Sequence, residues 1–378
     1  MSETAAPRDA FPRDVACDVV VVGLGPAGAT AAAVAARAGL SVVAIERKTV
    51  AGEPVQCAEF VPRSLATEIP DLAGAVVQPI AAMETYLGDG DPVRTPLPGH
   101  VVDRAVFDRR LAERAIAAGA RALFGTAVTA CDADGLRLAD GMRLRPRVIV
   151  GADGPKSLVG RAIGRENRIF AHTRQITVPL TRPHDATDIF LGAEYPGGYG
   201  WLFPKGAVAN LGLGLTAEAR GELPARLAAL HARLLAEGRV EAEIGALTGG
   251  LLPAGGLIDP AAEHGAALVL LAGDAAGLTN PITGAGIASA VISGRMAGEA
   301  AIAGVSGRPH AGADYREEIA DLFGPALERA CRRHRDLAAA HAAGGPSSTE
   351  LRRGWVAFDD YWTDAAPAGR QTETGVAA

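Results

Sequence analysis

Aromatic residues, cysteines and long apolar runs are all scarce in this sequence. Phe, Trp and Tyr make up 4% of the 378 residues, and the four cysteines are widely spaced, with no CxxC pair among them. Isolated cysteines provide neither a disulfide framework nor a zinc site, and they are typical of a reducing compartment. No apolar stretch approaches the roughly 18 residues that cross a membrane, and residues 1–14 lack the apolar core of a signal peptide. We therefore expect a cytoplasmic protein with at most peripheral membrane contact.

An excess of positive charge is also missing. The formal net charge is −6, whereas a general nucleic-acid-binding protein normally carries a basic surface, so we expect no nucleic-acid partner. The eight histidines show no HExxH spacing, and we expect no metal. What the chain has in quantity is apolar residues, at 48%, which is enough for the core of one large domain or of two joined domains.

The N-terminal region has the pattern of a strand–helix–strand unit. Residues 18–22 form a β-branched run that stops at Gly23, residues 26–38 are alanine-rich and helical in character, and residues 41–45 form a second apolar run that ends at Glu46. Short buried runs on either side of a helix predict two parallel strands with a right-handed crossover.

The turn after the first strand matches the GxGxxG fingerprint of dinucleotide-binding folds, with the sequence Gly23-Leu24-Gly25-Pro26-Ala27-Gly28. The first glycine permits the tight turn, the second lets the backbone approach a pyrophosphate, and the third allows close packing of the helix on the strand. Glu46 ends the second strand, where a carboxylate can accept hydrogen bonds from ribose hydroxyls, and this favours FAD or NAD over NADP.

Two later segments resemble the flavin motifs of the p-hydroxybenzoate hydroxylase-type flavoproteins. Residues 150–157, V-G-A-D-G-P-K-S, resemble their GADGxxS element, and residues 271–276, followed by Pro281 and Gly284-Ala285-Gly286, resemble their second flavin motif. The resemblance implies that Asp274 meets the ribityl chain and that the glycine-rich helix start meets the pyrophosphate and the flavin edge. We therefore expect FAD as the cofactor. No second GxGxxG follows a predicted strand, so we expect a transiently docking electron donor, ferredoxin-type or nicotinamide, or a substrate that supplies the electrons.

The fingerprint, these flavin motifs and a cysteine-bearing loop described below together predict the set of cofactor-binding residues. Arg104 occupies the family's arginine position in a helix expected over residues 103–118. Taken alone, Arg104 could be a surface cation and Asp153 could cap a turn, but the order and spacing of the three elements favour the flavin site. The full set is Gly23, Gly25, Pro26, Ala27, Gly28, Glu46, Arg47, Cys57, Ala58, Arg104, Val128, Asp153, Gly273, Asp274, Pro281, Gly284, Gly286 and Ile287.

A narrower resemblance, to the geranylgeranyl reductase family of FAD-dependent oxidoreductases, rests on two segments. Residues 52–59, G-E-P-V-Q-C-A-E, look like that family's cysteine-bearing loop, with Ala58 where the family usually has glycine. Residues 196–206 match its P-x-x-Y-x-W-x-F-P element. Strand alternation places Tyr199, Trp201 and Phe203 on one face.

The narrower resemblance also implies roles for these residues. It implies that the aromatic face and Pro204 line a substrate cavity over the flavin and that the loop places Cys57 against the flavin. Because an ordinary thiol keeps its proton at neutral pH, we expect Cys57 to be catalytic, as the proton donor. The alternatives are that the aromatic residues belong to an ordinary sheet core and that the lone cysteine is only a small buried apolar residue.

The expected fold is α/β, with a Rossmann-like FAD-binding domain and an inserted α+β substrate domain that carries an antiparallel sheet. The FAD-binding domain is expected to be discontinuous, over residues 15–75, 100–165 and 262–305. Residues 76–99 and 166–261 would form the substrate domain, and residues 306–363 a C-terminal helical segment. Residues 1–14 and 364–378 are expected to be disordered tails.

The function that the resemblance implies is the reduction of a carbon–carbon double bond in a hydrophobic, isoprenoid small molecule. Reduced flavin N5 would deliver hydride to one carbon, and a protein group or water would protonate the other. The alternatives are a flavin-dependent monooxygenase of an aromatic or polyketide substrate, a flavoprotein that only relays electrons between proteins, and a reductase of a non-isoprenoid biosynthetic intermediate. The fold is shared among such enzymes and does not decide between them.

Overall fold

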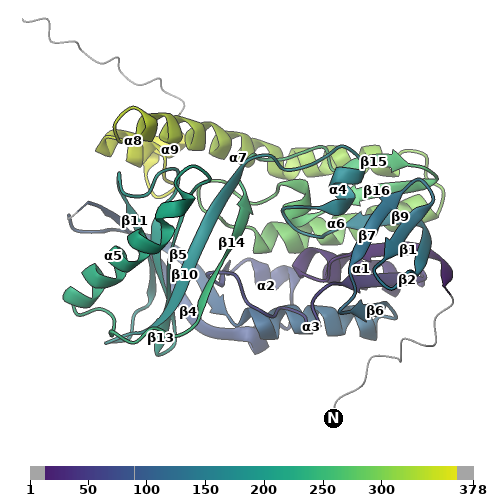
Figure 1. The fold of residues 1–378 in the computed structure, drawn as a ribbon, viewed down its shortest axis with the longest axis horizontal. Helices are drawn as coiled ribbons and strands as arrows, with labels where there is room; N and C mark the ends of the chain where they lie inside the picture. The colour runs from purple at the N-terminus through teal and green to yellow at the C-terminus, as the bar shows by residue number, and fades with distance from the viewer. Residues whose placement is uncertain (1–12, 89, 364–378) are drawn as a thin grey trace, which may run out of the picture.

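The computed structural model describes residues 13–88 and 90–363, and these residues form two sheets that lie side by side along the long axis of the molecule (Figure 1). Sheet A has the strand order β15-β16-β9-β1-β2-β6, and its four central pairings, from β16 to β6, are parallel. A hairpin, β7 and β8, extends it beside β9. The bounds are β1 Asp14–Val22, β2 Val42–Glu46, β6 Arg121–Phe124, β7 Val128–Asp132, β8 Gly135–Leu138, β9 Arg143–Gly151, β15 Ala261–His264 and β16 Ala267–Leu271.

Helices of small residues pack closely on sheet A. In α1 (Pro26–Arg37) six alanines and one glycine are buried in addition to Ala27, and α6 (Ile287–Val305) lies directly against it. A side chain at Gly294 of α6 would place its Cβ 2.2 Å from the carbonyl oxygen of Ala27, so the two helices approach at backbone distance. This packing explains the alanine and glycine content of both segments. The remaining helical elements near sheet A are α2 Leu65–Glu68, η2 Leu72–Ala75, α3 Arg104–Ala117, α4 Leu158–Ala162 and η4 Gly273–Ala276.

Sheet B forms the other half of the molecule. Its order is β14-β10-β13-β12-β11-β4-β5-β3, and all pairings are antiparallel except the one between β4 and β11. The bounds are β3 Phe60–Pro62, β4 Val76–Leu87, β5 Val93–Val102, β10 Phe170–Pro179, β11 Ala186–Leu191, β12 Gly200–Lys205, β13 Val208–Thr216 and β14 Leu247–Pro253.

The two faces of sheet B are covered differently. One face packs under α5 (Leu223–Ala236), which follows the short η3 (Arg220–Glu222), with Ile176, Leu213 and Leu230 in the shared core. The other face presents Trp201 and Phe203 to a second apolar cluster that includes residues of the C-terminal helices. The alternation expected along residues 199–203 is therefore realised, because Leu202 joins the α5 side.

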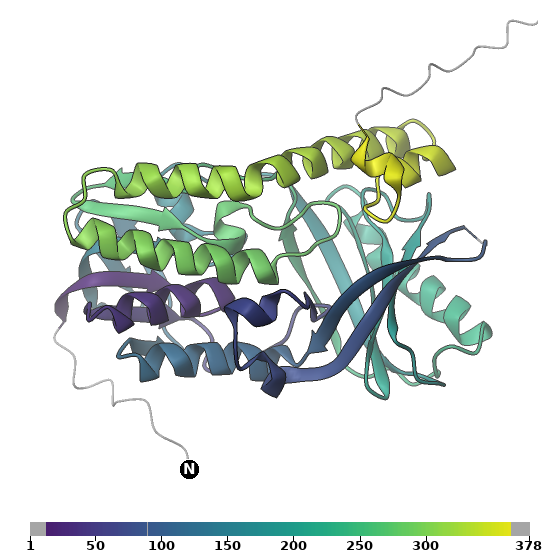
Figure 2. The ribbon, with the colours of Figure 1, turned by 180° about the vertical axis from the view of Figure 1, so that it is seen from behind.

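The C-terminal segment links the two halves. The long helix α7 (Ala311–Ala342) runs along the molecule from sheet A toward sheet B (Figure 2), where Nε2 of its His334 lies 3.1 Å from the carbonyl oxygen of Gly197. Two short helices follow, α8 (Ser348–Arg353) and α9 (Asp359–Trp362). Among residues 13–88 and 90–363, no helix combines the length and apolar character that a membrane span requires.

Several details of the expected elements are corrected. The first strand starts at Asp14 rather than at residue 18, and residues 60–62, directly after the cysteine-bearing loop, form the edge strand β3 of sheet B. Within α3, Ile116 is 46% exposed, whereas Phe107 is buried. The parallel β4–β11 pair makes sheet B mixed rather than purely antiparallel. The expected tails lie outside the described residues, apart from Arg13 and Asp14.

Candidate active site

The glycine turn at the end of β1 is closely packed at Gly23 and Gly28 and open at Gly25. Gly23 has φ +94°, and a Cβ there would lie 2.3 Å from the carbonyl oxygen of Ala152, so no other residue fits. A Cβ on Gly28 would lie 1.8 Å from the carbonyl oxygen of Gly23. Gly25, by contrast, has no atom within 4 Å of its Cβ position, and α1 begins at Pro26 with no side chain capping it. An open glycine at the start of an uncapped helix fits an anionic phosphate group.

Glu46 lies beside this turn, as expected, but its carboxylate also bonds to the chain itself. Oε2 accepts a hydrogen bond of 2.8 Å from the Leu24 N–H, and Oε1 accepts one of 2.9 Å from the Lys48 N–H. Glu46 thus ties the glycine turn to the end of β2. The neighbouring side chain, Arg47, is exposed. Both residues remain predicted cofactor contacts.

The carboxylate of Asp153 is directed at the start of the following helix, α4. It accepts hydrogen bonds from the Ser157 hydroxyl (2.5 Å) and from the N–H groups of Leu158 (2.6 Å) and Val159 (3.2 Å) at the start of α4. Burial raises the pKa of Asp153, against the effect of these hydrogen bonds. These hydrogen bonds engage both carboxylate oxygens, and Asp153 remains a predicted cofactor contact.

Asp274 lies in η4, at the carboxyl end of β16. Its Oδ1 accepts a hydrogen bond of 2.6 Å from the Thr279 hydroxyl. Burial raises the pKa of Asp274, while Thr279 and the positive charge of Arg104 act in the opposite direction. The following turn brings Gly284 (φ +67°) and Gly286, the N-cap of α6, to the same place, and no side chain caps that helix. Asp274 is therefore a carboxylate held in place with part of its surface still accessible.

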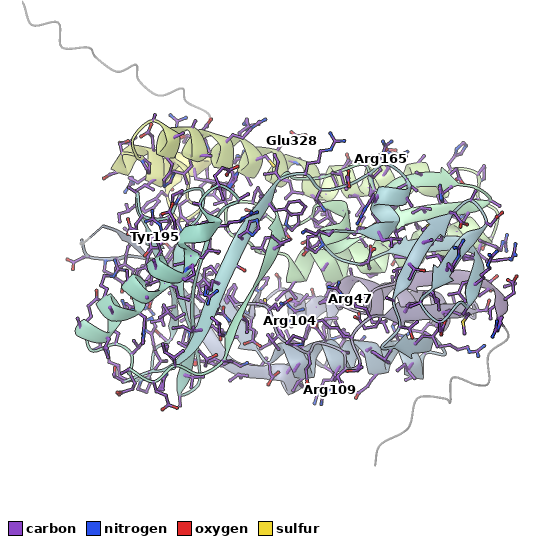
Figure 3. All side chains as sticks on the ribbon, in the orientation of Figure 1. Arg47, Arg104, Arg109, Arg165, Tyr195 and Glu328 are labelled. Carbon is purple, nitrogen blue, oxygen red and sulfur yellow. The ribbon has the colours of Figure 1, made fainter. Side chains whose placement is uncertain are left out.

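Arg104, near the middle of the molecule (Figure 3), is the first residue of α3. It forms a two-pronged ion pair with Asp108, with Nε–Oδ1 and Nη2–Oδ2 distances of 2.8 Å. Burial alone would lower the pKa of Arg104, but the Asp108 carboxylate outweighs it and raises the pKa. Arg104 is thus a fixed cation within the protein that acts on both Cys57 and Asp274.

The Cys57 loop is held by a buried carboxylate that the sequence did not single out. Glu59 is 2% exposed and has φ +72°, the left-handed region that non-glycine residues rarely adopt. Its carboxylate accepts from Lys205 Nζ (2.7 Å), Asn210 Nδ2 (2.9 Å) and the Arg104 N–H (2.9 Å). Its own N–H donates to the sulfur of Cys57 at 3.2 Å. Glu59 therefore connects the loop to α3, β12 and β13.

Gln175 joins the Cys57 loop to the aromatic strand. Its Nε2 donates to the carbonyl oxygen of Cys57 at 3.1 Å, and its Oε1 accepts from Trp201 Nε1 at 3.1 Å. Tyr199 contacts Trp201, with ring centroids 5.7 Å apart, and its hydroxyl donates to the Thr283 carbonyl oxygen at 2.5 Å, within the second flavin motif. The expected aromatic face, the cysteine loop and the flavin motif therefore meet in one region.

The C-terminal segment adds to this region in a way the sequence did not indicate. The ring of Trp355 lies 4.8 Å from that of Tyr199, and Phe358 and Tyr361 are buried in the same apolar cluster. The remaining residues expected to contact the cofactor or the substrate lie in two different places. Ala58 packs against this cluster and Pro204 is buried in β12, whereas Val128 starts β7 and packs against the sheet A core. The aromatic residues that follow the long helix are the sequence signal that could have suggested this C-terminal contribution.

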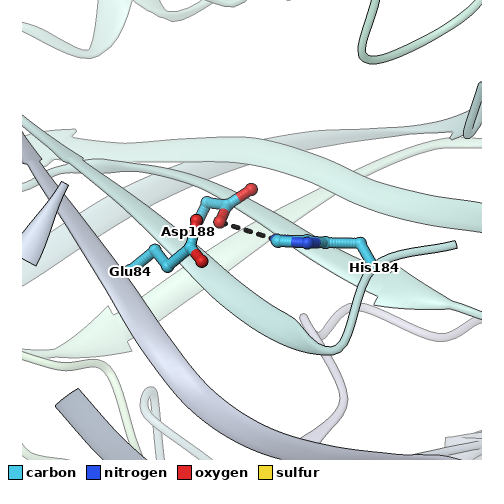
Figure 4. A group of neighbouring side chains, drawn as sticks. All are labelled: Glu84, His184 and Asp188. Atoms are coloured by element: carbon cyan, nitrogen blue, oxygen red, sulfur yellow. Dashed lines mark hydrogen bonds and ion pairs between the residues drawn. The ribbon is translucent and has the colours of Figure 1, made fainter. Parts of the chain in front are cut away.

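A separate group of potential metal ligands lies in sheet B, away from these motifs. Single ligand atoms of Glu84, His184 and Asp188 lie within 4.8 Å of one another (Figure 4). The carboxylate oxygens already have partners. Glu84 accepts from Arg94 at 2.6 Å and from Tyr86 at 3.1 Å, and Asp188 accepts from His184 at 2.8 Å and pairs with Arg239. The hydrogen bond to Asp188 raises the pKa of His184. This group is an ion-pair network that ties β4 to β11.

Comparison with known proteins places these features in context. Residues 18–150 match the family model of FAD dependent oxidoreductases, and residues 171–245 match that of the geranylgeranyl reductase catalytic domain. The chain is 36% identical over 312 residues to a digeranylgeranylglycerophospholipid reductase of Methanothrix thermoacetophila, with 77% of this chain and 78% of the relative covered. It is 35% identical over 314 residues to digeranylgeranylglycerophospholipid reductase 2 of Methanopyrus kandleri, with 75% and 76% covered.

Among solved structures, a geranylgeranyl bacteriochlorophyll reductase-like protein from Thermoplasma acidophilum has a TM-score of 0.78 at 27% identity, with 86% of this chain and 88% of that chain covered. PqsL of Pseudomonas aeruginosa, a probable FAD-dependent monooxygenase, has a TM-score of 0.66 at 22% identity, with 87% and 99% covered. At that identity the second likeness concerns the fold alone.

Proposed function

The chain belongs to the geranylgeranyl reductase family of FAD-dependent oxidoreductases, and from this membership we propose that it saturates carbon–carbon double bonds of an isoprenoid substrate. It is an FAD-dependent oxidoreductase. The residues around the glycine turn fit the ADP half of FAD, because Gly25 is open, α1 is uncapped and Glu46 lies beside the turn. Asp274 and the turn that leads to α6 would hold the ribityl chain and the flavin end.

The observation that carries the proposal is that the cysteine loop and the aromatic strand lie in the same region as the second flavin motif. Gln175 connects the Cys57 loop to Trp201, and Tyr199 connects the aromatic strand to the turn after Asp274. A mainly apolar, aromatic wall next to the expected flavin end suits a hydrocarbon chain. Such a wall is a poor match for a polar substrate or for a partner protein that only exchanges electrons with the flavin.

In this proposal, bound reduced FAD supplies the hydride for one alkene carbon. The chain's own residues do the rest. The rings of Tyr199 and Trp201 exclude water and present π faces, which stabilise positive charge that develops on carbon. The second carbon needs a proton, and we assign its donation to Cys57, whose loop is joined to Trp201 through Gln175.

The surroundings of Cys57 support its role as the proton donor. Its sulfur accepts a hydrogen bond from the Glu59 N–H at 3.2 Å and lies close to the guanidinium of Arg104. A hydrogen-bond donor and a cation both stabilise the negative charge left on sulfur when the proton leaves. Arg104 would therefore act as a positioning and electrostatic group, itself fixed by Asp108.

The proposal is tested with the FAD-loaded protein under anaerobic conditions. Dithionite reduces the flavin, so the assay does not depend on the natural donor, and geranylgeranyl lipids are offered as substrates. The expected product gains two hydrogen atoms per double bond by mass spectrometry. A hydroxylated product formed only with oxygen would instead identify a monooxygenase. Flavin reoxidation by a ferredoxin without any turned-over isoprenoid would identify an electron relay, and turnover only of non-isoprenoid alkenes would overturn the substrate class.

A further inference from the structure

The C-terminal cap, residues 347–363, covers the aromatic face of β12. It contains α8 and α9, which lie together at the far end of α7 (Figure 1). Trp355 and Phe358 of the cap are both 3% exposed and belong to the same apolar cluster as Trp201 and Phe203. Trp201 and Phe203 are themselves only 7% and 9% exposed. The face expected to contact the substrate is therefore already covered by the chain itself.

Trp355 is the residue of the cap that contacts the aromatic face directly. Its ring lies 4.8 Å from that of Tyr199, with 61° between the ring planes, an edge-on contact that is typical of aromatic pairs. The ring of Tyr199 lies in turn 5.7 Å from that of Trp201. Since so little of Trp201 is exposed, a hydrocarbon chain packs on this pair of rings only after the cap has moved away. Trp355 and such a chain therefore exclude each other.

The buried position of Trp355 is incomplete in one respect. Its Nε1 is buried and has no hydrogen-bond partner among residues 13–88 and 90–363. Trp362 of the same cap, by contrast, donates its Nε1–H to the carbonyl oxygen of Val356 at 3.0 Å. A buried donor without an acceptor gives up its hydrogen bond to water and gains none in return. The covered state of Trp355 therefore has a free-energy cost that exposure of the indole removes.

The connection between α7 and the cap permits a movement. Gly344 and Gly345 lie between the end of α7 and the cap, with φ +112° and +110°. A Cβ on Gly344 would meet no atom within 4 Å, and one on Gly345 would meet the Cβ of Ala193 at 3.4 Å. Glycine adopts a wider range of backbone angles than other residues, and hinges consist of a few residues at the ends of elements. The two glycines are therefore suited to act as a hinge.

Beyond this hinge, internal hydrogen bonds hold the cap together. A capping box starts α8, and Nε of Arg352 donates to the carboxylate of Asp360 at 2.9 Å. From α7, the buried Arg333 donates to the carbonyl oxygen of Tyr361 at 3.0 and 3.2 Å. These last hydrogen bonds end on a backbone group at the far end of the cap, so the cap separates from Arg333 without a break in α8 or α9.

We propose that the cap is a lid that opens on Gly344 and Gly345, and that Trp355 in the closed protein occupies the place that an apolar substrate chain takes on Tyr199 and Trp201. The unpaired indole N–H favours opening, because the open lid exposes it to water. This inference rests on the proposed function and deepens it, since it identifies the residue that the substrate displaces. Trp355 thereby sets the affinity of the protein for an apolar chain.

The first test measures the binding of geranylgeraniol to protein loaded with oxidised FAD, in which no hydride is available for turnover. The variants are Trp355→Ala and Trp355→Phe, and Trp362→Ala is the matched control because Trp362 is in the same cap but is 55% exposed. With about 1–10% of the wild type open, loss of the Trp355 ring should tighten binding about tenfold to a hundredfold. Trp355→Phe keeps a ring on Tyr199 and should bind much as wild type does, like the control.

Three results of this measurement would overturn the proposal. Weaker binding by Trp355→Ala would make the indole a wall of the substrate site rather than a group that the substrate displaces. An equal change in Trp362→Ala would indicate a general effect on the cap. Failure of both wild type and Trp355→Ala to bind geranylgeraniol would exclude an apolar chain as the occupant.

Hydrogen–deuterium exchange of the wild type tests the movement itself and needs no variant. Saturating geranylgeraniol should accelerate exchange of the amides of residues 347–363, because the bound chain keeps the lid open, and should leave α5 unchanged. Slower or unchanged exchange in the cap would overturn the proposal. Faster cap exchange without any reduction of geranylgeraniol after dithionite would leave the lid standing and refute the proposed function. Reduction with a cap that stays protected would refute the lid alone.

Discussion

Replacement of Glu59 tests whether a single buried carboxylate holds the Cys57 loop in place. Its three donors are Lys205 Nζ, Asn210 Nδ2 and the Arg104 N–H, at 2.7, 2.9 and 2.9 Å. Removal of one partner of a buried ion pair costs about 3–5 kcal/mol of unfolding free energy. Since the Lys205 side chain is 22% exposed and can still reach water, we take the lower end, about 3 kcal/mol, for Glu59→Ala.

The backbone of Glu59 allows a sharper comparison. At φ +72° a non-glycine residue carries about 1–2 kcal/mol of strain, which glycine avoids. Glycine also makes the unfolded chain more flexible, which costs about 0.4–1 kcal/mol. Glu59→Gly should therefore be about 0.5–1 kcal/mol more stable than Glu59→Ala, although both lose the same hydrogen bonds. Glu59→Gln keeps the shape and should lie between these variants and wild type.

Urea unfolding at a fixed, saturating FAD concentration measures these differences, because bound ligand adds to stability. Glu53→Gln is the matched control, since Glu53 is in the same loop and pairs with Arg109 at 3.0 Å, with both side chains about half exposed. Such a surface pair contributes about 0–1 kcal/mol. Site-resolved alkylation of Cys57 should accelerate in Glu59→Ala and stay unchanged in Glu53→Gln. The reasoning is refuted if Glu59→Ala is no less stable than the control and Cys57 reacts at the wild-type rate.

Four further outcomes are expected. Cys57→Ser should retain FAD and fold but lose on the order of 10²–10⁴ in turnover, as measured by steady-state kinetics, and wild-type turnover would make the thiol only a wall of the cavity. Asp274→Ala should weaken FAD about tenfold to a hundredfold by fluorescence titration, because a buried hydrogen-bonding partner is lost, and unchanged affinity would mean that the motif is misassigned. Trp201→Ala should impair substrate turnover far more than FAD content, whereas loss of both with unfolding by circular dichroism would make it core packing. His334 has a pKa lowered by burial, so the unfolded state takes up the proton first and stability should fall as the pH drops below about 6.5. Melting curves at pH 7.5 and 5.5 should therefore show a smaller acid loss in His334→Gln, and an equal loss would exclude this histidine as the cause.

Local sequence was sufficient wherever a structure depends on neighbours in the chain. The βαβ unit and its glycine turn were predicted from residues 18–46 because strand length, helix composition and the spacing of Gly23, Gly25 and Gly28 are all set within a few turns of backbone. The common face of Tyr199, Trp201 and Phe203 followed from strand alternation alone. Cofactor and family were predicted for the same reason, since their motifs are short and their order along the chain is visible.

Tertiary structure decided which partner each polar group takes. Asp153 could meet a cofactor or cap a helix, and only the position of α4 directs its carboxylate to Ser157. Glu59 ends the cysteine-bearing loop, but the loop pattern does not identify its partners, and packing brings Lys205 and Asn210 to it and holds its backbone in a left-handed conformation.

The longest-range contacts are the ones that local patterns describe least. Trp355 meets Tyr199 across more than a hundred residues, and the β4–β11 pair is parallel. Many alternative partners satisfy the same hydrophobic pattern, and the choice among them depends on the summed packing free energy of whole sheets and helices. The sequence by itself determined the cofactor-binding unit and the family of this protein, and the folded chain decided what surrounds the cysteine loop.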